Sequence, residues 1–318
     1  MTKKFSFKNI WEVLKNSFTG FADDRVMTMS SSLAYYTVFS MAPLLIIIIS
    51  LSGIFLGQDA AEGKVYEQLT SFVGSNTASQ LQEMIKNASL SGKSKIAVII
   101  GVITLIIGAT TVFSQIQDSI NSIWGLKPKP KKGWLKFLKN RFLSFSIIIG
   151  LGFLLLVSLG ISALIDGFSD LLRAYFPHVT VVVFYIINIV ITLAIITLIF
   201  GTIFKVLPDA KIKWKDVLVG SLVTALLFML GKFGISFYIS KSQVGSTYGA
   251  AGSLVILLLW VYYSSTILYY GAEFTKAYAV KFGSAIHPDD YAVTTKTVEI
   301  ESGNQSIQEK EKDKKRPD

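Results

Sequence analysis

Residues 179–204 read VTVVVFYIINIVITLAIITLIFGTIF, an unbroken apolar run without one charged side chain. An α-helix needs about 20 mostly apolar residues to cross the hydrocarbon core of a bilayer, so this stretch predicts a membrane span. Five further stretches have the same character. Together they predict six transmembrane helices at 33–57, 95–113, 143–165, 179–204, 217–240 and 251–272. The predicted fold class is therefore all-α, a polytopic membrane protein.

The segments that connect these spans differ in charge. Lys and Arg are concentrated in the N-terminal segment, in the links after the second and fourth spans, and in the C-terminal tail. Links rich in Lys and Arg stay in the cytoplasm, so both termini are predicted to be cytoplasmic. No cleavable signal peptide is expected, because the first apolar run is too long for one.

The composition agrees with a membrane protein, since 51% of the residues are hydrophobic and the net charge is +10. In a soluble protein this charge would suggest nucleic acid. Here we expect it to set the topology and to attract anionic headgroups at the cytoplasmic face, with no nucleic-acid partner. The chain has no cysteine, and its two histidines, His178 and His287, lie far apart in the sequence. Neither a metal site nor a cofactor is predicted.

Three regions follow from these patterns: a cytoplasmic amphipathic segment at 1–32, the transmembrane domain at 33–280, and a charged cytoplasmic tail at 281–318 that we expect to be disordered. Apolar residues at helical spacing over 5–21 predict a helix in the first region. Two placements are open for this helix, in the membrane interface or against the inner face of the protein itself. The outward connection 58–94 is predicted to form a helical hairpin.

One ionisable side chain, Lys232, falls well inside a predicted span. Charged residues in spans are costly and are default candidates for function. Lys232 either faces the helix bundle, where small neighbours would accommodate it, or extends toward the outer headgroups.

Three polar stripes fall in the inner half of the predicted membrane, on the first, second and sixth spans. We hypothesise that they line a cavity facing the cytoplasm, with Asp118 and Glu273 as its acidic floor. The alternative is that Glu273 pairs with Lys276, Asp118 is solvated, and the tyrosines are interface anchors. Together with Lys232, the candidate substrate-pathway residues are Tyr36, Ser40, Gln115, Asp118, Thr266, Tyr270 and Glu273.

Small and helix-breaking residues indicate close helix contacts. Gly245 and Gly249 have the spacing of a known helix-packing motif, Gly252 follows them into the sixth span, and Pro43 is expected to kink the first span.

Four stretches carry a family resemblance: SLAYYTVFSMAP at 32–43, TVFSQIQDSINSIW at 111–124, FKVLPDAKIKWKDVL at 204–218 and YGAAG at 248–252. They resemble the YihY/BrkB family of bacterial inner-membrane proteins, formerly named ribonuclease BN. The resemblance implies a multi-pass protein of the bacterial plasma membrane whose activity is not settled. A ribonuclease is not expected, because the sequence holds no cluster of ligands for a two-metal phosphodiester site.

The sequence also shows no pairing of a nucleophile with a base, so no enzyme is predicted. The leading interpretation is a transporter-like protein that handles a lipid or an envelope precursor, with membrane lipids as partners. A non-transporting envelope scaffold or assembly factor, and an ion-coupled exporter of small solutes, are the alternatives. Whether the protein forms a homo-oligomer or binds envelope proteins is left open.

Overall fold

The structure is a computed structural model that describes residues 6–40, 95–129, 177–241 and 252–295, with isolated residues between 63 and 82. Several predicted features lie outside the described residues: the span 143–165, the later part of the span 33–57, most of the hairpin 58–94, Pro43, Gly245 and Gly249.

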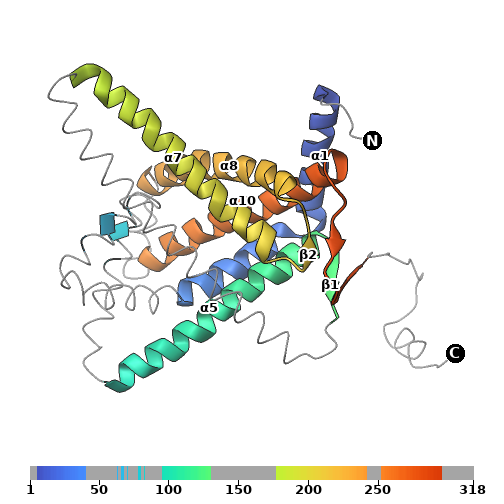
Figure 1. Ribbon diagram of the computed structural model, residues 1–318. Helices are drawn as coiled ribbons and strands as arrows, with labels where there is room; N and C mark the ends of the chain where they lie inside the picture. The colour runs from blue at the N-terminus through green and yellow to red at the C-terminus, as the bar shows by residue number, and fades with distance from the viewer. Residues whose placement is uncertain are drawn as a thin grey trace.

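The described chain is mostly helical (Figure 1). Its long helices are α1 (Phe7–Asp23), α5 (Lys95–Ile123), α7 (Pro177–Val206), α8 (Trp214–Lys241) and α10 (Gly252–Lys281). The predicted spans 179–204, 217–240 and 251–272 are confirmed as helices, because they coincide with α7, α8 and α10. Within these helices, three stretches are long and apolar enough to cross a membrane: Ile186–Val206, Trp214–Ile239 and Leu254–Phe282.

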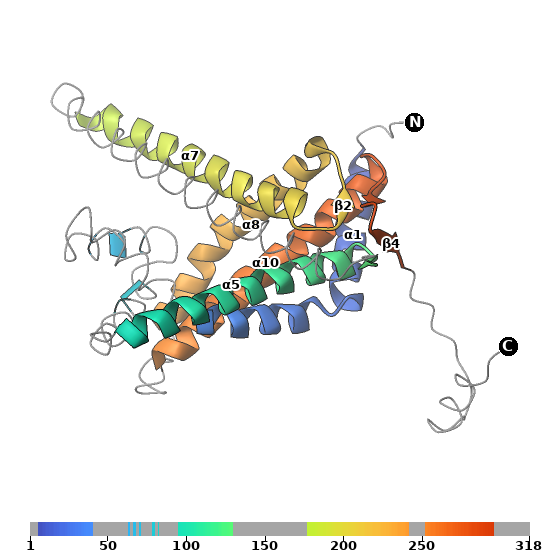
Figure 2. The same ribbon diagram turned by 60° about the horizontal axis from the view of Figure 1, so that its bottom comes forward.

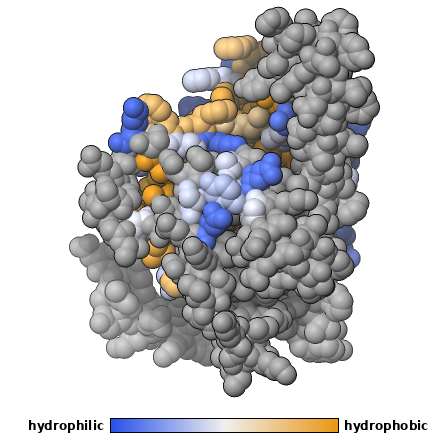
Figure 3. Space-filling model, turned by 90° about the vertical axis from the view of Figure 1, so that its left-hand side faces the viewer, coloured by the Kyte–Doolittle hydropathy of each residue, from blue (hydrophilic) through white to orange (hydrophobic). Residues whose placement is uncertain are grey.

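These helices expose apolar side chains along their length. A single ridge on α8 consists of exposed residues three or four positions apart, namely Leu218, Leu222, Leu226, Leu230, Phe233 and Phe237. Apolar side chains also lie at the surface in the view from the left of Figure 1 (Figure 3). A continuous apolar ridge of this length is unfavourable in water and favourable against lipid, so it agrees with helices that lie in a bilayer.

Helices α8 and α10 pack through a reciprocal pair of glycines and threonines. A Cβ atom on Gly220 of α8 would lie 1.9 Å from the Thr275 hydroxyl of α10, and one on Gly271 of α10 would lie 2.0 Å from the Thr224 hydroxyl of α8. Each threonine hydroxyl donates to the carbonyl of the glycine on its own helix, at 2.7 Å in both cases. Small residues thus allow the two backbones to approach closely, and the hydroxyls need no partner across the interface.

Helices α5, α7, α8 and α10 converge toward one end of the molecule and separate toward the other, in both Figure 1 and Figure 2. At the convergent end lie two short antiparallel strand pairs. Strand β1 (Leu126–Pro128) pairs with β4 (Ala292–Thr294), and β2 (Ala210–Lys211) pairs with β3 (His287–Pro288). These strands differ from the all-α prediction. They join the links after the second and fourth predicted spans to the C-terminal segment.

The start of the tail is ordered, which corrects the prediction of disorder from residue 281. Helix α10 ends at Lys281, and the segment that follows is described as far as Thr295. Its backbone N–H at Ser284 donates to the Asp216 carboxylate at 2.9 Å, and β3 and β4 add backbone pairing. The polar composition misled the prediction, because backbone hydrogen bonds to other segments stabilise this stretch without a need for apolar side chains. The predicted disorder of 296–318 lies outside the described residues.

Candidate functional site

A polar cleft of about 570 Å³ opens at the convergent end of the helices. Its walls come from the last turn of α5, strand β1, the end of α1, helix α10 and the segment after β4. The lining consists of residues 121–128 together with Asp24, Asp118, Lys276, Thr294 and Thr295. We refer to this space as the polar cleft.

The end of α5 forms the floor of the polar cleft because a glycine ends the helix there. Gly125 has a φ of +66°, a left-handed conformation that favours glycine, and its N–H donates to the Ser122 carbonyl at 3.0 Å. This is a common way to end an α-helix. The Gly125 carbonyl then accepts the Thr295 N–H at 2.7 Å, so the C-terminal segment is fixed directly to the helix end.

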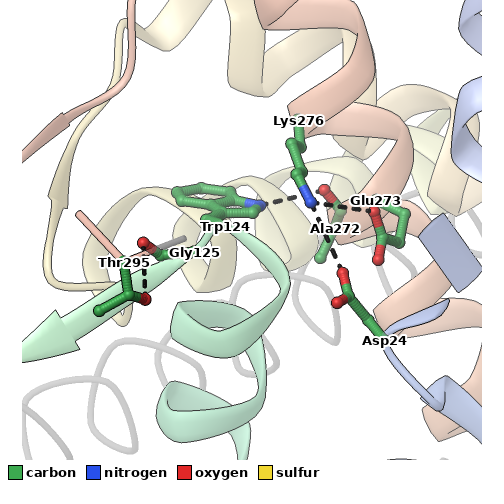
Figure 4. Close-up of polar contacts among 7 residues, drawn as sticks. All are labelled: Asp24, Trp124, Gly125, Ala272, Glu273, Lys276 and Thr295. Carbon is green, nitrogen blue, oxygen red and sulfur yellow. Dashed lines mark hydrogen bonds and ion pairs between the residues drawn. The ribbon is translucent and has the colours of Figure 1, made fainter. Parts of the chain in front are cut away.

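A cluster of three charged side chains lies beside the polar cleft (Figure 4). The Lys276 ammonium lies 3.5 Å from an Asp24 carboxylate oxygen and 3.8 Å from Oε2 of Glu273. Glu273 is buried, with 2% of its side chain exposed, and its Oε1 atom has no hydrogen-bond partner in the described part of the chain. One ammonium group is therefore shared between two carboxylates, one of them buried.

Helix α1 comes close to α10 because a glycine faces the buried carboxylate. A Cβ atom on Gly20 would lie 2.5 Å from Oε2 of Glu273, so a larger residue does not fit at that position. On the same side, the rings of Phe18 and Phe21 contact the ring of Tyr270, with centroids 5.1 and 6.1 Å apart. A further ion pair joins Glu12 to Lys281.

The tryptophan at the end of α5 connects the polar cleft to α10. The indole N–H of Trp124 donates to the Ala272 carbonyl at 3.1 Å, next to Glu273 in the chain (Figure 4). The indole is nearly buried, and a buried indole N–H normally needs such a partner. The contact fixes the floor of the polar cleft against the helix that carries Lys276.

Behind this floor lies a buried hydrogen-bond network centred on Asp209, in the loop between α7 and α8. Its carboxylate accepts hydrogen bonds from the side chains of Gln117, Asn121 and Tyr291, each at 2.9 Å. Its backbone N–H donates to the Asn121 amide oxygen at 2.8 Å. Burial and the neighbouring Asp209 raise the pKa of the Tyr291 phenol above its ordinary range, so the phenol stays a donor.

The structure brings two of the predicted site residues to the same region. Asp118 is exposed and lines the polar cleft, while Glu273 lies behind Lys276, which lines it as well. The local pairing of Glu273 with Lys276, part of the alternative interpretation, is also present. One predicted carboxylate thus lines a cleft, and the other takes part in the local ion pair that the alternative interpretation expects.

The remaining predicted residues do not line the polar cleft. Four make contacts within their own helices: Ser40 and Thr266 donate to backbone carbonyls, Gln115 donates to Ser119, and Tyr36 contacts the Tyr35 ring. Tyr270 packs on α1, as described above. Lys232 is half-buried on α8, and Gly252 is buried at the start of α10.

Sequence reasoning missed Asp24, Asn121, Asp209 and Tyr291. A signal existed for Asn121, because it lies four positions after Gln117 on a helix face that also carries the buried Ile120. Polar amides among buried apolar residues indicate a buried partner. No comparable signal existed for Asp209, which follows a proline in a connecting segment and resembles an ordinary turn residue. Within the described ranges, no three His, Asp or Glu side chains gather to hold a metal ion.

Comparisons with known proteins agree with a membrane protein. The chain is 26% identical over 265 residues to a UPF0761 membrane protein of Pseudoalteromonas atlantica, which covers 81% of this chain and 83% of the relative. It is 27% identical over 263 residues to one of Tolumonas auensis, with 79% and 80% covered. A relative in Saccharophagus degradans is longer, and the chain matches 59% of it at 26% identity. No solved structure matches the chain.

The family model described as Virulence factor BrkB matches residues 17–290, which include every element of the polar cleft except Thr294 and Thr295. The resemblance found in the sequence motifs is thereby confirmed, and the chain belongs to the Virulence factor BrkB family of membrane proteins.

Proposed function

We propose that this protein is a transporter-like protein of the bacterial inner membrane that handles a lipid or an envelope precursor through the polar cleft. The observation that carries the proposal is the position of the cleft. It lies where α1, α5 and α10 meet, at one end of helices that are long and apolar enough to cross a membrane, and it is lined by charged side chains of both signs. An amphipathic molecule could keep its polar group there while its chains stay in the bilayer.

Helix α1 supports this proposal because its faces have different surroundings. Val13 and Ser17 are buried, whereas Phe7, Trp11 and Phe18 expose 87%, 63% and 64% of their surface. Figure 1 shows α1 running across the direction of α8 and α10. Both placements considered for this helix thus apply in the proposed arrangement: one face packs on α10, and another presents aromatic rings to the interfacial lipid.

The proposed arrangement has six spans with both termini in the cytoplasm. The strand pairs and the ion pairs from α1 to α10 support one part of it, since they gather the N-terminal helix, two basic links and the C-terminal segment at one end. Loops rich in Lys and Arg favour the cytoplasmic side for that end.

The absence of cysteine permits a direct test of orientation. Lys129 and Lys241 are both exposed, at opposite ends of the described helices, and each can be replaced by cysteine. A membrane-impermeant maleimide applied to intact spheroplasts is expected to label Lys241→Cys and not Lys129→Cys. The reverse labelling, or labelling of both, would contradict the proposed topology.

Lipid handling is tested by native mass spectrometry of the protein in a maltoside detergent. We expect wild-type protein to retain a lipid that an Asp118→Asn/Glu273→Gln double variant loses. Lys232→Met is the matched comparison, because Lys232 does not line the polar cleft. Absence of any retained lipid, with a co-purifying protein in its place, would favour the alternative of an envelope scaffold.

A further inference from the structure

We infer that the polar cleft binds a phosphoethanolamine group, with the primary ammonium at Asp118 and the phosphate at Lys127. The inference rests on the proposed function, since it names the headgroup of the lipid that the cleft would take. It goes beyond that function because a lipid could be handled without any recognition of its headgroup.

The first argument is the balance of charge in the lining. Two carboxylates, Asp24 and Asp118, and two ammonium groups, Lys127 and Lys276, line the polar cleft. Their formal charges cancel, so the lining by itself favours neither a purely anionic nor a purely cationic ligand. A group that carries one charge of each sign finds a partner for both.

The second argument is how these charges are distributed. On the wall formed by α1 and α10, Asp24 and Lys276 already pair with each other at 3.5 Å. On the wall formed by α5 and β1, the side chains of Asp118 and Lys127 are both exposed. This second wall is therefore the one whose charged groups are most accessible to a ligand.

The two exposed charges decide which end of the ligand goes where. Asp118 lies on the exposed face of α5, and Lys127 follows beyond the helix end, on β1. An ammonium pairs with the carboxylate along the helix, and a phosphate pairs with the lysine beside the strand.

The hydrogen-bonding capacity of the ligand gives a third argument. A primary ammonium donates three hydrogen bonds, whereas a choline group donates none. The exposed carboxylate of Asp118 can accept such a bond, so it favours an ethanolamine group over a choline group.

The test is isothermal titration of the full-length protein in a maltoside detergent. The ligands are dihexanoyl phosphatidylethanolamine, the corresponding phosphatidylglycerol and phosphatidylcholine, and free O-phosphoethanolamine. We expect the ethanolamine lipid to bind about tenfold or more tightly than the other two lipids, as charge-assisted hydrogen bonds of the ammonium would provide. Stronger binding of the ethanolamine lipid than of free O-phosphoethanolamine would identify a bilayer lipid as the occupant. Equal binding of the two would identify a soluble phosphate ester as the occupant.

Two variants locate the site. Asp118→Asn is expected to weaken binding of the ethanolamine lipid about tenfold while it changes that of the choline lipid little, and Lys127→Met is expected to weaken both. The matched control is Lys213→Met, which removes the same charge beside a different cavity, formed with Lys211 and His287. Its affinity should equal that of the wild type.

Phosphatidylglycerol binding as tightly as the ethanolamine lipid would overturn the inference, as would wild-type affinity in both cleft variants. The same experiments distinguish a failure of this inference from a failure of the proposed function. A retained lipid of another headgroup class would leave lipid handling intact and refute only the headgroup, whereas the absence of any bound lipid would refute both.

Discussion

The phenol of Tyr291 donates a 2.9 Å hydrogen bond to the buried carboxylate of Asp209, and this contact fastens the C-terminal segment to the loop between α7 and α8. A neighbouring contact joins the same two segments at the surface of the molecule. Lys211 and Asp290 form an ion pair at 2.6 Å, with 58% and 91% of their side chains exposed. The loop between α7 and α8 is thus joined to the C-terminal segment by one buried and one exposed contact.

Tyr291→Phe is predicted to destabilise this end of the molecule by about 1 kcal/mol, because it leaves a buried carboxylate with one donor fewer. Asp290→Asn should leave stability nearly unchanged, because exposed ion pairs contribute little. Thermal unfolding in detergent, together with the protease sensitivity of the C-terminal segment, measures both effects. A larger loss in Asp290→Asn than in Tyr291→Phe would contradict the role assigned to the buried network.

The same tyrosine predicts a dependence on pH. Its pKa is raised in the folded protein, so the stabilisation from its protonated phenol is complete below the unfolded value of about 10 and is lost as the pH rises above it. Hydrogen exchange or proteolysis of the segment at several alkaline pH values should show it loosening in the wild type. Other groups also titrate at alkaline pH, so the wild type is compared with Tyr291→Phe at each pH. The stability of the variant should depend less on pH than that of the wild type.

Replacement of either interfacial glycine should disturb the packing of α8 on α10. A Cβ atom on Gly220 or on Gly271 would collide with a threonine of the other helix, so Gly220→Ala and Gly271→Ala are each predicted to cost about 1–3 kcal/mol. Gly234→Ala on α8 is the control, because a Cβ atom there meets nothing within 4 Å. Alanine favours a helix, so this control should be neutral or slightly stabilising. Equal melting temperatures for all three variants would argue against the close approach.

The contact between α1 and the buried carboxylate is tested by a double variant. Gly20→Ala should weaken the docking of α1 on α10, since the new methyl group would overlap the Glu273 carboxylate. Shortening the partner with Glu273→Ala should relieve part of that loss, so the two effects should not add. Cross-linking between cysteines placed at Phe18 and Tyr270, whose rings are in contact, reports on docking directly. Strict additivity would mean that the two residues do not meet.

The sequence predicted the long helices well because the signal is strong. A run such as 179–204 leaves few alternatives to a membrane helix, and α7 extends only two residues beyond it at each end. The polar region was predicted in part. Asp118 and Glu273 are conspicuous as carboxylates beside apolar spans, whereas Asp24 and Asp209 lie in connecting segments where acidic residues are ordinary. The strands were missed because two or three residues carry no periodicity, and their partners lie far away in the chain.

Those remote pairings constrain the order of folding. Thr295 bonds to Gly125 across 170 positions of sequence, and Tyr291 bonds to Asp209 across 82. A membrane chain is inserted from its N-terminus as it is synthesised, so the apolar helices can be in the bilayer while the links between them still lack their final partners. The region around the polar cleft is then assembled only after the residues up to Thr295 have left the ribosome. A product truncated before Thr295 would reach the membrane with this region incomplete, so the contacts of the C-terminal segment mark a chain that has been synthesised at least that far.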